Sequence, residues 1–354
     1  MRRVLLTGAG GFTGSHVLRH LLMNTDWDII CPVTFRHRGN SDRIASALRS
    51  NDDWHRRVCV DMCDLTAPVA DTVARRWGEV DYVLNIASES HVERSLEDPV
   101  PFVRNNVELI LNVLEYARRV KPRLFLQMST DEVFGPAPNG VNYREWDPHV
   151  PSNPYSASKS AQEAIAISYW RAYGVPLVVT NTMNLFGEMQ DTEKYFAKIM
   201  RAVTRGEKLT VHVGPNGEAG SRFYIHARNF ADAWLHLVRL FDEPGYSPDF
   251  VFQDGHTGPM GLPAYADGHD RPARYNVVGN REVDNLALAE MIADEIGRSL
   301  RWIPVNWHES RPGHDLRYAL DGSKLAATGW KSPVSLEESV RQTVRWTLDH
   351  PEWL

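Results

Sequence analysis

The chain has 354 residues, of which 43% are hydrophobic and 24% are charged. This composition is ordinary for a globular protein and argues against extended disorder, and the length predicts about two domains. The 39 basic and 45 acidic residues give a formal net charge of −6, so no general attraction to nucleic acid or to an anionic membrane is expected.

Cysteine is scarce, and the three cysteines are Cys31, Cys59 and Cys63. An odd number without a repeated spacing argues against a disulfide framework and against a metal site, so we expect three reduced thiols and no bound metal. The apolar run after Met1 is too short for a signal peptide, and no run approaches about 18 apolar residues. We therefore expect a soluble, cytoplasmic protein.

Short apolar runs alternate with helical patterns through the first half of the chain. In chain order we expect strands at residues 4–6, 28–33, 57–60, 80–87, 124–128 and 177–181, and helices at residues 15–23, 69–77, 101–119 and 156–173. Repeated strand–helix–strand units form a parallel sheet that is covered on both faces. The pattern therefore predicts an α/β protein whose residues 1–182 form a Rossmann-type, doubly wound sheet domain that binds a dinucleotide.

After about residue 184 the alternation becomes irregular. Residues 243–272 are rich in Gly, Pro and His and have no clear period, which indicates either a functional lid or a poorly ordered loop. Amphipathic helices return at residues 283–296 and 336–348. We expect residues 183–354 to form mainly a smaller substrate-binding domain, with segments near 221–241 and 272–280 returning to the sheet domain.

The sequence TGAGGFTG, at residues 7–14, joins the first expected strand to the first expected helix. Its glycines allow a tight turn, a close approach of backbone N–H groups to a pyrophosphate, and close packing of the helix on the strand. A glycine pattern alone is weak evidence, but its place at the first strand-to-helix turn indicates dinucleotide binding. The expected contacts come from Gly8, Gly11, Phe12, Thr13 and Gly14.

The choice between NAD and NADP depends on the end of the second strand. An NAD site usually has an acid there that binds the ribose 2′-hydroxyl, whereas this chain reads VTFRHR at residues 33–38. Arg36 and Arg38 would suit a 2′-phosphate, so we lean slightly to NADP, although both could be ordinary surface arginines. Asp61 and Met62, after the third strand, stand where an adenine edge could be read, and Asp61 could equally be a simple turn residue.

The sequence YSASK, at residues 155–159, places Tyr155 and Lys159 on one helical face. A free phenol has a pKa near 10, and a lysine charge about 4 Å away contributes on the order of 4 kcal/mol at an effective dielectric constant near 20, which is about three pKa units. Lys159 can therefore make Tyr155 a working base. Such pairs occur by chance in many helices, and the upstream glycine loop is what favours catalysis here.

The sequence STDEVFG, at residues 129–135, sets Asp131 and Glu132 directly after the strand expected at residues 124–128. Two acids followed by Gly135-Pro136 could form a solvated turn. The carboxyl ends of parallel strands, however, form the ligand crevice of such a sheet. Both acids can face one substrate only if the chain leaves strand geometry, as Gly135-Pro136 allows.

These motifs resemble the extended short-chain dehydrogenase/reductase superfamily and, within it, the nucleotide-sugar 4,6-dehydratases, nearest the dTDP-glucose 4,6-dehydratases. The matching segments span nearly the whole chain and are TGAGGFTG (7–14), DMCD (61–64), ASESHVERS (87–95), STDEVFG (129–135), YSASK (155–159), YNVVG (275–279) and RPGHDLRYA (311–319). The glycine loop and YSASK define only the superfamily, whereas STDEVFG and RPGHDLRYA are far more specific.

The resemblance implies a lyase that uses NAD(P). Tyr155, aided by Thr130 and Lys159, would take the proton from a sugar 4-hydroxyl while a hydride passes from C4 to the nicotinamide. Glu132 would then remove the C5 proton, Asp131 would protonate the departing C6 hydroxyl, and the hydride would return to C6. The product would be a nucleotide 4-keto-6-deoxy sugar. Relatives that only epimerise or decarboxylate generally lack the acid pair.

The resemblance also implies further binding residues. The cofactor would contact Ala87, Ser88, Tyr155 and Lys159, and the nucleotide sugar would contact Ser90, His91, Thr130, Asn184, Glu193, Lys194, Arg222, Arg311 and His314, of which the last five could equally be surface residues. The dTDP-glucose enzymes typically read NNYG where this chain has NLFG at residues 184–187, and the chain also departs from them at Thr210, at His212 and at Gly220-Ser221. Strict recognition of thymidine is therefore not expected.

Two other functions stay open. One is an epimerase or related nucleotide-sugar oxidoreductase, which product analysis would distinguish. The other is a nucleotide-sensing protein that has lost catalysis, and the joint presence of the five catalytic candidates argues against it. The family implies a homodimer formed by the helices at residues 101–119 and 156–173, although their periodicity would also fit burial within one chain.

Overall fold

The computed structural model describes residues 1–243, 271–306 and 316–354, so the loop expected at residues 243–272 falls almost entirely outside it. The chain forms two compact units. The first comprises Met1–Thr130, Pro154–Asn181 and Ala231–Tyr275, and the second comprises Asp131–Asn153, Thr182–Phe230 and Asn276–Leu354.

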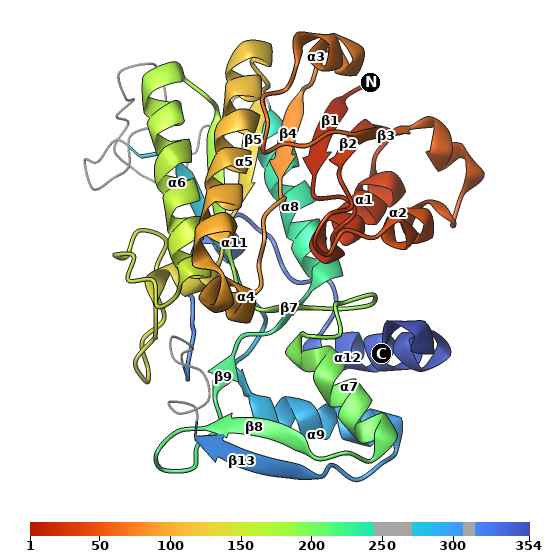
Figure 1. Ribbon diagram of the computed structural model, residues 1–354, viewed down its shortest axis with the longest axis vertical. Coiled ribbons are helices and arrows are strands. Elements are labelled where there is room, and N and C mark those ends of the chain that lie inside the picture. The colour runs from red at the N-terminus through yellow and green to blue at the C-terminus, as the bar shows by residue number, and fades with distance from the viewer. Residues whose placement is uncertain (244–270, 307–315) are drawn as a thin grey trace. The chain divides into compact units, whose positions relative to one another are not determined.

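A seven-stranded sheet forms the centre of the first unit (Figure 1). Its order is β11-β6-β5-β4-β1-β2-β3, with β1 at Arg3–Thr7, β2 at Asp28–Val33, β3 at Val58–Met62, β4 at Tyr82–Asn85, β5 at Leu124–Met128, β6 at Leu177–Thr182 and β11 at Ala273–Val277. Strands β1 to β6 pair in parallel. The inner strands are buried almost throughout, because helices cover both faces, whereas the edge strand β3 is partly exposed. The predicted doubly wound α/β fold is confirmed.

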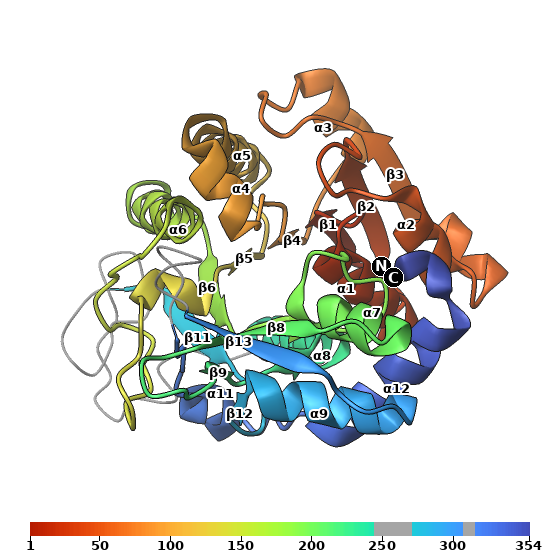
Figure 2. The ribbon, with the colours of Figure 1, turned by 60° about the horizontal axis from the view of Figure 1, so that its bottom comes forward.

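Helices lie on both faces of this sheet, and Figure 2 shows α5 and α6 on one side of the row of strands and α1 on the other. The helices are α1 at Phe12–Asn24, α2 at Ser41–Leu48, α3 at Asp71–Trp77, α4 at Val92–Glu97, α5 at Pro99–Val120, α6 at Pro154–Tyr173 and α8 at Ala227–Asp242, and a 3-10 turn, η1, lies at Asp52–Arg56. Ile110 and Val113 of α5 share a buried core with Val83 of β4 and Phe125 of β5. The apolar face of α5 therefore fixes the central strands whose ends carry the candidate site.

The second unit has its own hydrophobic core. Its elements are η2 at Asp131–Phe134, β7 at Leu185–Phe186, α7 at Tyr195–Arg205, β8 at Leu209–Val213, β9 at Ser221–Arg222, β10 at Ile225–His226, β12 at Val283–Asp284, α9 at Asn285–Ile296, β13 at Trp302–Asn306, α11 at Ser323–Ala327, α12 at Leu336–Asp349 and η4 at Pro351–Trp353. Strands β8 and β13 pair in parallel, and residues of α7, α9 and α12 share one buried cluster.

One predicted helix begins later than expected. The pattern at residues 283–296 predicts a single helix, but Val283 and Asp284 form β12 and pair with β9. The side chain of Asp284 accepts a hydrogen bond of 2.8 Å from the backbone N–H of Ala287, so it caps α9 instead of lying inside it.

Candidate active site

The glycine loop lies between β1 and α1 and leaves no room for side chains at two of its glycines. Gly8 has φ +74°, and a Cβ there would lie 3.0 Å from the backbone nitrogen of Ala87. A Cβ on Gly14 would lie 2.0 Å from the carbonyl oxygen of Gly8. Gly11 is the N-cap of α1 and has no side chain, so the first backbone N–H groups of α1 can meet an anion. Phe12 and Thr13 form that first turn.

Thr7, the last residue of β1, ties the glycine loop to the end of β4. Its hydroxyl accepts hydrogen bonds of 3.0 Å from the backbone N–H groups of Ile86 and Ala87 and donates one of 2.7 Å to Asn85 Oδ1. Ala87 and Ser88 are thereby held beside the loop. This is where the sequence predicts the cofactor to lie.

A line of buried polar side chains continues from Asn85 across the sheet. Asn85 Nδ2 donates 2.7 Å to Gln127 Oε1 on β5, and Gln127 Nε2 lies 3.4 Å from Gln162 Oε1 on α6. Lys159 Nζ donates 2.6 Å to the same Gln162 oxygen. We call Thr7, Asn85, Gln127, Gln162 and Lys159 the buried polar chain, and none of its members is more than 3% exposed.

Tyr155 and Lys159 both lie in the first two turns of α6 and are buried. Lys159 Nζ also donates 2.8 Å to the carbonyl of Met128, at the end of β5. Burial lowers the pKa of Lys159 to about 7, and the negative charge of Glu163 opposes this shift. The two oxygens that accept from the ammonium favour its charged form. The expected base and its cation therefore lie on one helix, and the cation contacts the end of β5.

Two further contacts secure this region of the first unit. Glu163 pairs with Arg274 of β11, and both are at most 3% exposed. Asn181 Nδ2 donates 2.8 Å to Glu163 Oε1 and 3.2 Å to the carbonyl of Thr130. Thr130, the last residue of the first unit, is thus held directly after β5.

Asp131 and Glu132 open the second unit in the 3-10 turn η2 and are only 3% and 8% exposed. The solvated turn that the sequence left open is therefore wrong. The chain leaves strand geometry at the end of β5, before the acids, whereas the sequence placed this change at Gly135-Pro136. Asn153 Nδ2 donates 3.2 Å to Glu132 Oε2. Gly135, with φ +76°, has no space for a Cβ beside the carbonyl of Val150.

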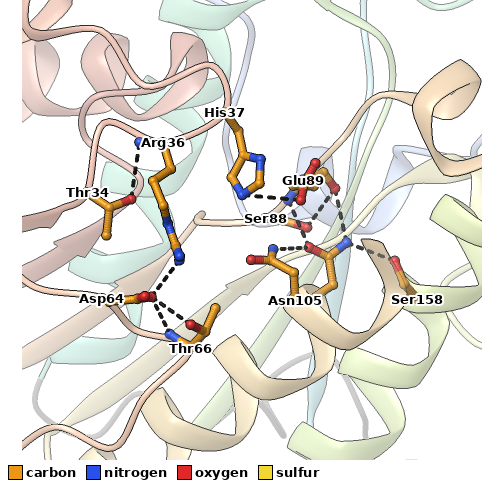
Figure 3. Close-up of polar contacts among 10 residues, drawn as sticks. Thr34, Arg36, His37, Asp64, Thr66, Ser88, Glu89, Asn105 and Ser158 are labelled. Atoms are coloured by element: carbon orange, nitrogen blue, oxygen red, sulfur yellow. Dashed lines mark hydrogen bonds and ion pairs between the residues drawn. The ribbon is translucent and has the colours of Figure 1, made fainter. Parts of the chain in front are cut away.

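Arg36 and Asp64 meet where β2 and β3 end (Figure 3). Arg36 NH2 lies 2.7 Å from Asp64 Oδ1. Arg38 is also exposed, and its backbone carbonyl accepts a hydrogen bond of 2.7 Å from Arg43. In the same view His37 Nε2 contacts Glu89 Oε1 at 3.3 Å. Arg36, one of the two arginines that the sequence singled out, therefore pairs with an acid.

Asp61 and Met62, expected beside the adenine, end the edge strand β3. Asp61 Oδ2 accepts a hydrogen bond of 2.7 Å from Trp77 Nε1 and pairs with Arg76. Burial opposes ionisation of Asp61, but these hydrogen bonds outweigh it and lower the pKa. The carboxylate is already engaged, whereas the Met62 side chain is exposed. Adenine recognition by these residues stays a prediction.

The residues expected to bind the sugar nucleotide are distributed over both units. Ser90 is exposed, and His91 caps α4 through Nδ1, 3.4 Å from the backbone nitrogen of Arg94. In the second unit, Asn184 lies just before β7, Glu193 and Lys194 precede α7, and Arg222 is buried over the ring of Tyr318 with 4.5 Å to its centroid. Arg311 and His314 lie outside the described residues.

Sequence reasoning missed Asn85, Gln127, Gln162, Asp64 and Glu89. A signal was present for the first two, since each is an amide near the end of an otherwise apolar strand, and they are direct neighbours in the β4–β5 register. Glu89 is held by Asn106, whose Oδ1 accepts 2.8 Å from the backbone N–H of Glu89. Asp64 belongs to the DMCD motif at residues 61–64, but the sequence did not indicate its contact with Arg36.

Two general features concern the described part of the chain alone. Its His, Cys, Asp and Glu side chains form no group of three or more that could hold a metal ion. None of its helices is both long enough and apolar enough to cross a lipid bilayer.

Known proteins resemble this chain over its full length. The family model for GDP-mannose 4,6 dehydratase matches residues 5–343. The low-salt glycan biosynthesis protein Agl12 of Haloferax volcanii is 32% identical over 99% of each chain, and dTDP-glucose 4,6-dehydratase 1 of Escherichia coli is 29% identical over 99% of this chain and 94% of its own. The solved structure of the dTDP-glucose 4,6-dehydratase DesIV from Streptomyces venezuelae, with NAD bound, has a TM-score of 0.80 and 26% identity over 99% of this chain and 98% of its own. The chain belongs to the GDP-mannose 4,6 dehydratase family, within the superfamily of nucleotide-sugar dehydratases and epimerases.

Proposed function

We propose that this chain is a nucleotide-sugar 4,6-dehydratase, a lyase that converts an NDP-hexose to the NDP-4-keto-6-deoxyhexose. The observation that carries the proposal is the buried acid pair, Asp131 and Glu132, which follows Thr130 and β5 directly. Burial of two adjacent carboxyl groups is costly, and such costs concentrate where a function requires them. A 4-epimerase, which inverts only C4, needs no acid at C6 and no base at C5.

The glycine loop suits a dinucleotide, because Gly8 and Gly14 admit no side chain and α1 offers free N–H groups at its start. Bound there, NAD or NADP would supply the hydride acceptor and donor. DesIV has NAD bound, whereas the sequence of this chain leans slightly to NADP through Arg36 and Arg38. Both cofactors are therefore included in the tests.

The side chains then divide the chemistry. Tyr155, aided by Lys159 on the same face of α6 and by Thr130 directly after β5, removes the proton of the sugar 4-hydroxyl, while the hydride from C4 would pass to the bound dinucleotide. The resulting 4-ketone acidifies the C5 proton, which Glu132 removes. Asp131, which must begin protonated for this role, gives its proton to the departing C6 hydroxyl, so that water leaves, and the hydride would return from the bound dinucleotide to C6.

We propose that the nucleotide is not restricted to thymidine, because Thr210, His212 and Gly220-Ser221 depart from the dTDP-glucose enzymes. Initial rates with dTDP-, UDP-, CDP- and GDP-hexoses under one set of conditions test this. An exclusive preference for the dTDP substrate would contradict it.

We also propose a homodimer formed by α5 and α6. Val100 and Leu111 on α5 and Tyr173 on α6 are exposed apolar residues in the single chain. Sedimentation equilibrium of the full chain should give twice the mass of 40.2 kDa. A monomer at micromolar concentration would contradict the proposal.

The decisive experiment is a single turnover in deuterated water that follows nicotinamide absorbance and deuterium at C5. Glu132→Gln removes the base but keeps the size, so elimination should slow by about 10²–10⁴-fold while reduced nicotinamide accumulates. Asp131→Asn should also slow the loss of water, yet C5 exchange should persist because Glu132 is intact. Tyr155→Phe should give neither reduced cofactor nor exchange.

Glu145→Gln is the matched control. Glu145 is a buried glutamate of the same chain segment, and its Oε1 accepts 3.2 Å from the backbone N–H of Asn276. Burial raises the pKa of Glu145, so an amide should replace it with little change in rate. A near-normal elimination rate in Glu132→Gln, or a 4-epimer as the product of the natural chain, would refute the dehydratase.

A further inference from the structure

The loop at residues 34–40 is anchored to the glycine loop, which fixes where Arg36 lies. The ring of Phe35 packs against Gly10, where a Cβ would lie 3.1 Å from it, and the backbone N–H of Asn40 donates 2.9 Å to the Gly10 carbonyl. Phe35 and His37 have positive φ angles of 49° and 55° on either side of Arg36. Left-handed geometry is uncommon for such residues and persists only where the surroundings enforce it. Arg36 is therefore held beside the glycine loop, where the pyrophosphate of a dinucleotide is expected.

The acid that Arg36 meets comes from the third strand. Asp64 Oδ1 accepts from Arg36 NH2 at 2.7 Å, from the backbone N–H of Thr66 at 3.0 Å and from its hydroxyl at 2.7 Å (Figure 3). Burial opposes ionisation, but the Thr66 hydrogen bonds and the charges of Arg36 and His37 outweigh it and lower the pKa of Asp64. Asp64 is therefore an anion at neutral pH.

The other carboxylate oxygen of Asp64, Oδ2, accepts none of these hydrogen bonds. Among the described residues, all three hydrogen bonds fall on Oδ1, and the side chain is 40% exposed. Oδ2 can therefore accept a hydrogen bond from a bound molecule. A sugar hydroxyl is a suitable donor, whereas a phosphate dianion would approach like charge.

A dinucleotide on the glycine loop places its adenosine ribose at the end of the second strand, where NAD proteins have an acid. No acid stands at the carboxyl end of β2, but Asp64, which follows β3, contacts Arg36 there. We propose that Asp64 replaces the missing second-strand acid, accepts the ribose 2′-hydroxyl and neutralises Arg36, so that the site selects NAD over NADP. This inference rests on the proposed dinucleotide site and reverses the lean to NADP taken from Arg36 and Arg38.

The test compares dissociation constants of NADH and NADPH for the full chain, measured by nicotinamide fluorescence. The ratio Kd(NADPH)/Kd(NADH) should exceed 10 for the natural sequence. Asp64→Asn keeps the shape and the acceptor for Thr66, and it should lower the ratio at least tenfold by freeing Arg36 for the 2′-phosphate. Adding Arg36→Ala to Asp64→Asn should raise the ratio again, since NADPH then loses its cation.

Asp71→Asn is the matched control, because Asp71 Oδ1 pairs with Arg119 at the same 2.7 Å. Arg119 lies near the end of α5, shortly before β5 begins, and not after the carboxyl ends of β2 and β3. This variant should leave the ratio unchanged. A natural chain that prefers NADPH, or a ratio that Asp64→Asn leaves unchanged while both dinucleotides bind, would overturn the role of Asp64 and leave the dehydratase standing. Binding of neither dinucleotide would overturn both.

Discussion

The buried polar chain and the Arg36–Asp64 pair both lie at the carboxyl edge of one parallel sheet, but only the second is open to water. No member of the buried polar chain is more than 3% exposed, whereas the side chains of Arg36 and Asp64 are 48% and 40% exposed. A buried polar group that loses its partner costs about 1–3 kcal/mol, and an exposed ion pair contributes about 0–1 kcal/mol. Buried contacts therefore fix the positions of Lys159 and of the strand ends, and exposed contacts can select a ligand with little effect on stability.

The largest expected effect on stability comes from the buried ion pair between Glu163 and Arg274, beside the buried polar chain. Arg274→Met leaves the Glu163 carboxylate with Asn181 but without its ion-pair partner, and should lower the free energy of unfolding by about 3–5 kcal/mol. Urea denaturation measures the loss. The control, Arg281→Met, breaks an exposed pair with Glu337 and should cost at most about 1 kcal/mol. Equal losses would mean that burial does not separate the two classes.

The pH dependence of stability should show the buried amine. Burial lowers the pKa of Lys159 to about 7, against the charge of Glu163, whereas the unfolded chain keeps this proton to about pH 10. Between pH 8 and 10 the unfolded state binds more protons, so the stability of the natural chain rises with pH by up to about 1.4 kcal/mol per unit from this group.

Lys159→Met removes that contribution, so the difference in unfolding free energy between the natural chain and the variant should grow in favour of the natural chain from pH 8 to pH 10. Other titrating groups cancel in the difference. Urea melts at three pH values suffice. A difference that does not change with pH would show that Lys159 stays charged in the folded protein, held by its two oxygen acceptors.

A smaller effect is expected within the buried polar chain itself. Asn85→Leu removes the partner of Thr7 and of Gln127 and should cost about 1–3 kcal/mol. Asn24→Leu, at the exposed end of α1, should stay within about 0.5 kcal/mol. Thermal or urea unfolding measures the free energy of unfolding of both variants. If Asn85→Leu is as stable as the natural chain, the buried hydrogen bonds of Asn85 do not contribute to stability.

The smallest effect on stability should come from Asp64→Asn. Its exposed pair with Arg36 predicts a loss of about 0–1 kcal/mol, although the same substitution should change the cofactor preference at least tenfold. Unfolding and binding measured on one preparation check this. A loss above about 2 kcal/mol would show that Asp64 supports the fold. A change in cofactor preference could then result from altered folding and would not be evidence for a direct contact with the ribose.

The sequence predicted the strands of the first unit well because buried parallel strands appear as continuous apolar runs. The strands at residues 28–33 and 124–128 coincide with β2 and β5. In the second unit β7, β9, β10 and β12 have two residues each, too few to show a period. The helix α7 was missed although Phe196, Ile199, Met200 and Val203 have helical spacing and are buried.

The candidate site was predicted where its residues are close in sequence. The glycine loop and the pair of Tyr155 and Lys159 are local patterns, so their elements could be assigned from the chain alone. The contact of Arg36 with Asp64 depends on the register of β2 against β3, which sets Val33 beside Met62. The burial of Glu132 depends on Asn153, at the end of a long loop. Such contacts have no local signature.

The position of β11 in the sheet has a consequence for how the chain folds during synthesis. Strand β11, at Ala273–Val277, completes the sheet beside β6, and residues 183–272 separate the two. Until β11 leaves the ribosome, β6 has an unpaired edge and Glu163 lacks Arg274. An open edge next to an uncompensated buried carboxylate favours association with other nascent chains. A chain that ends before Ala273 keeps both defects.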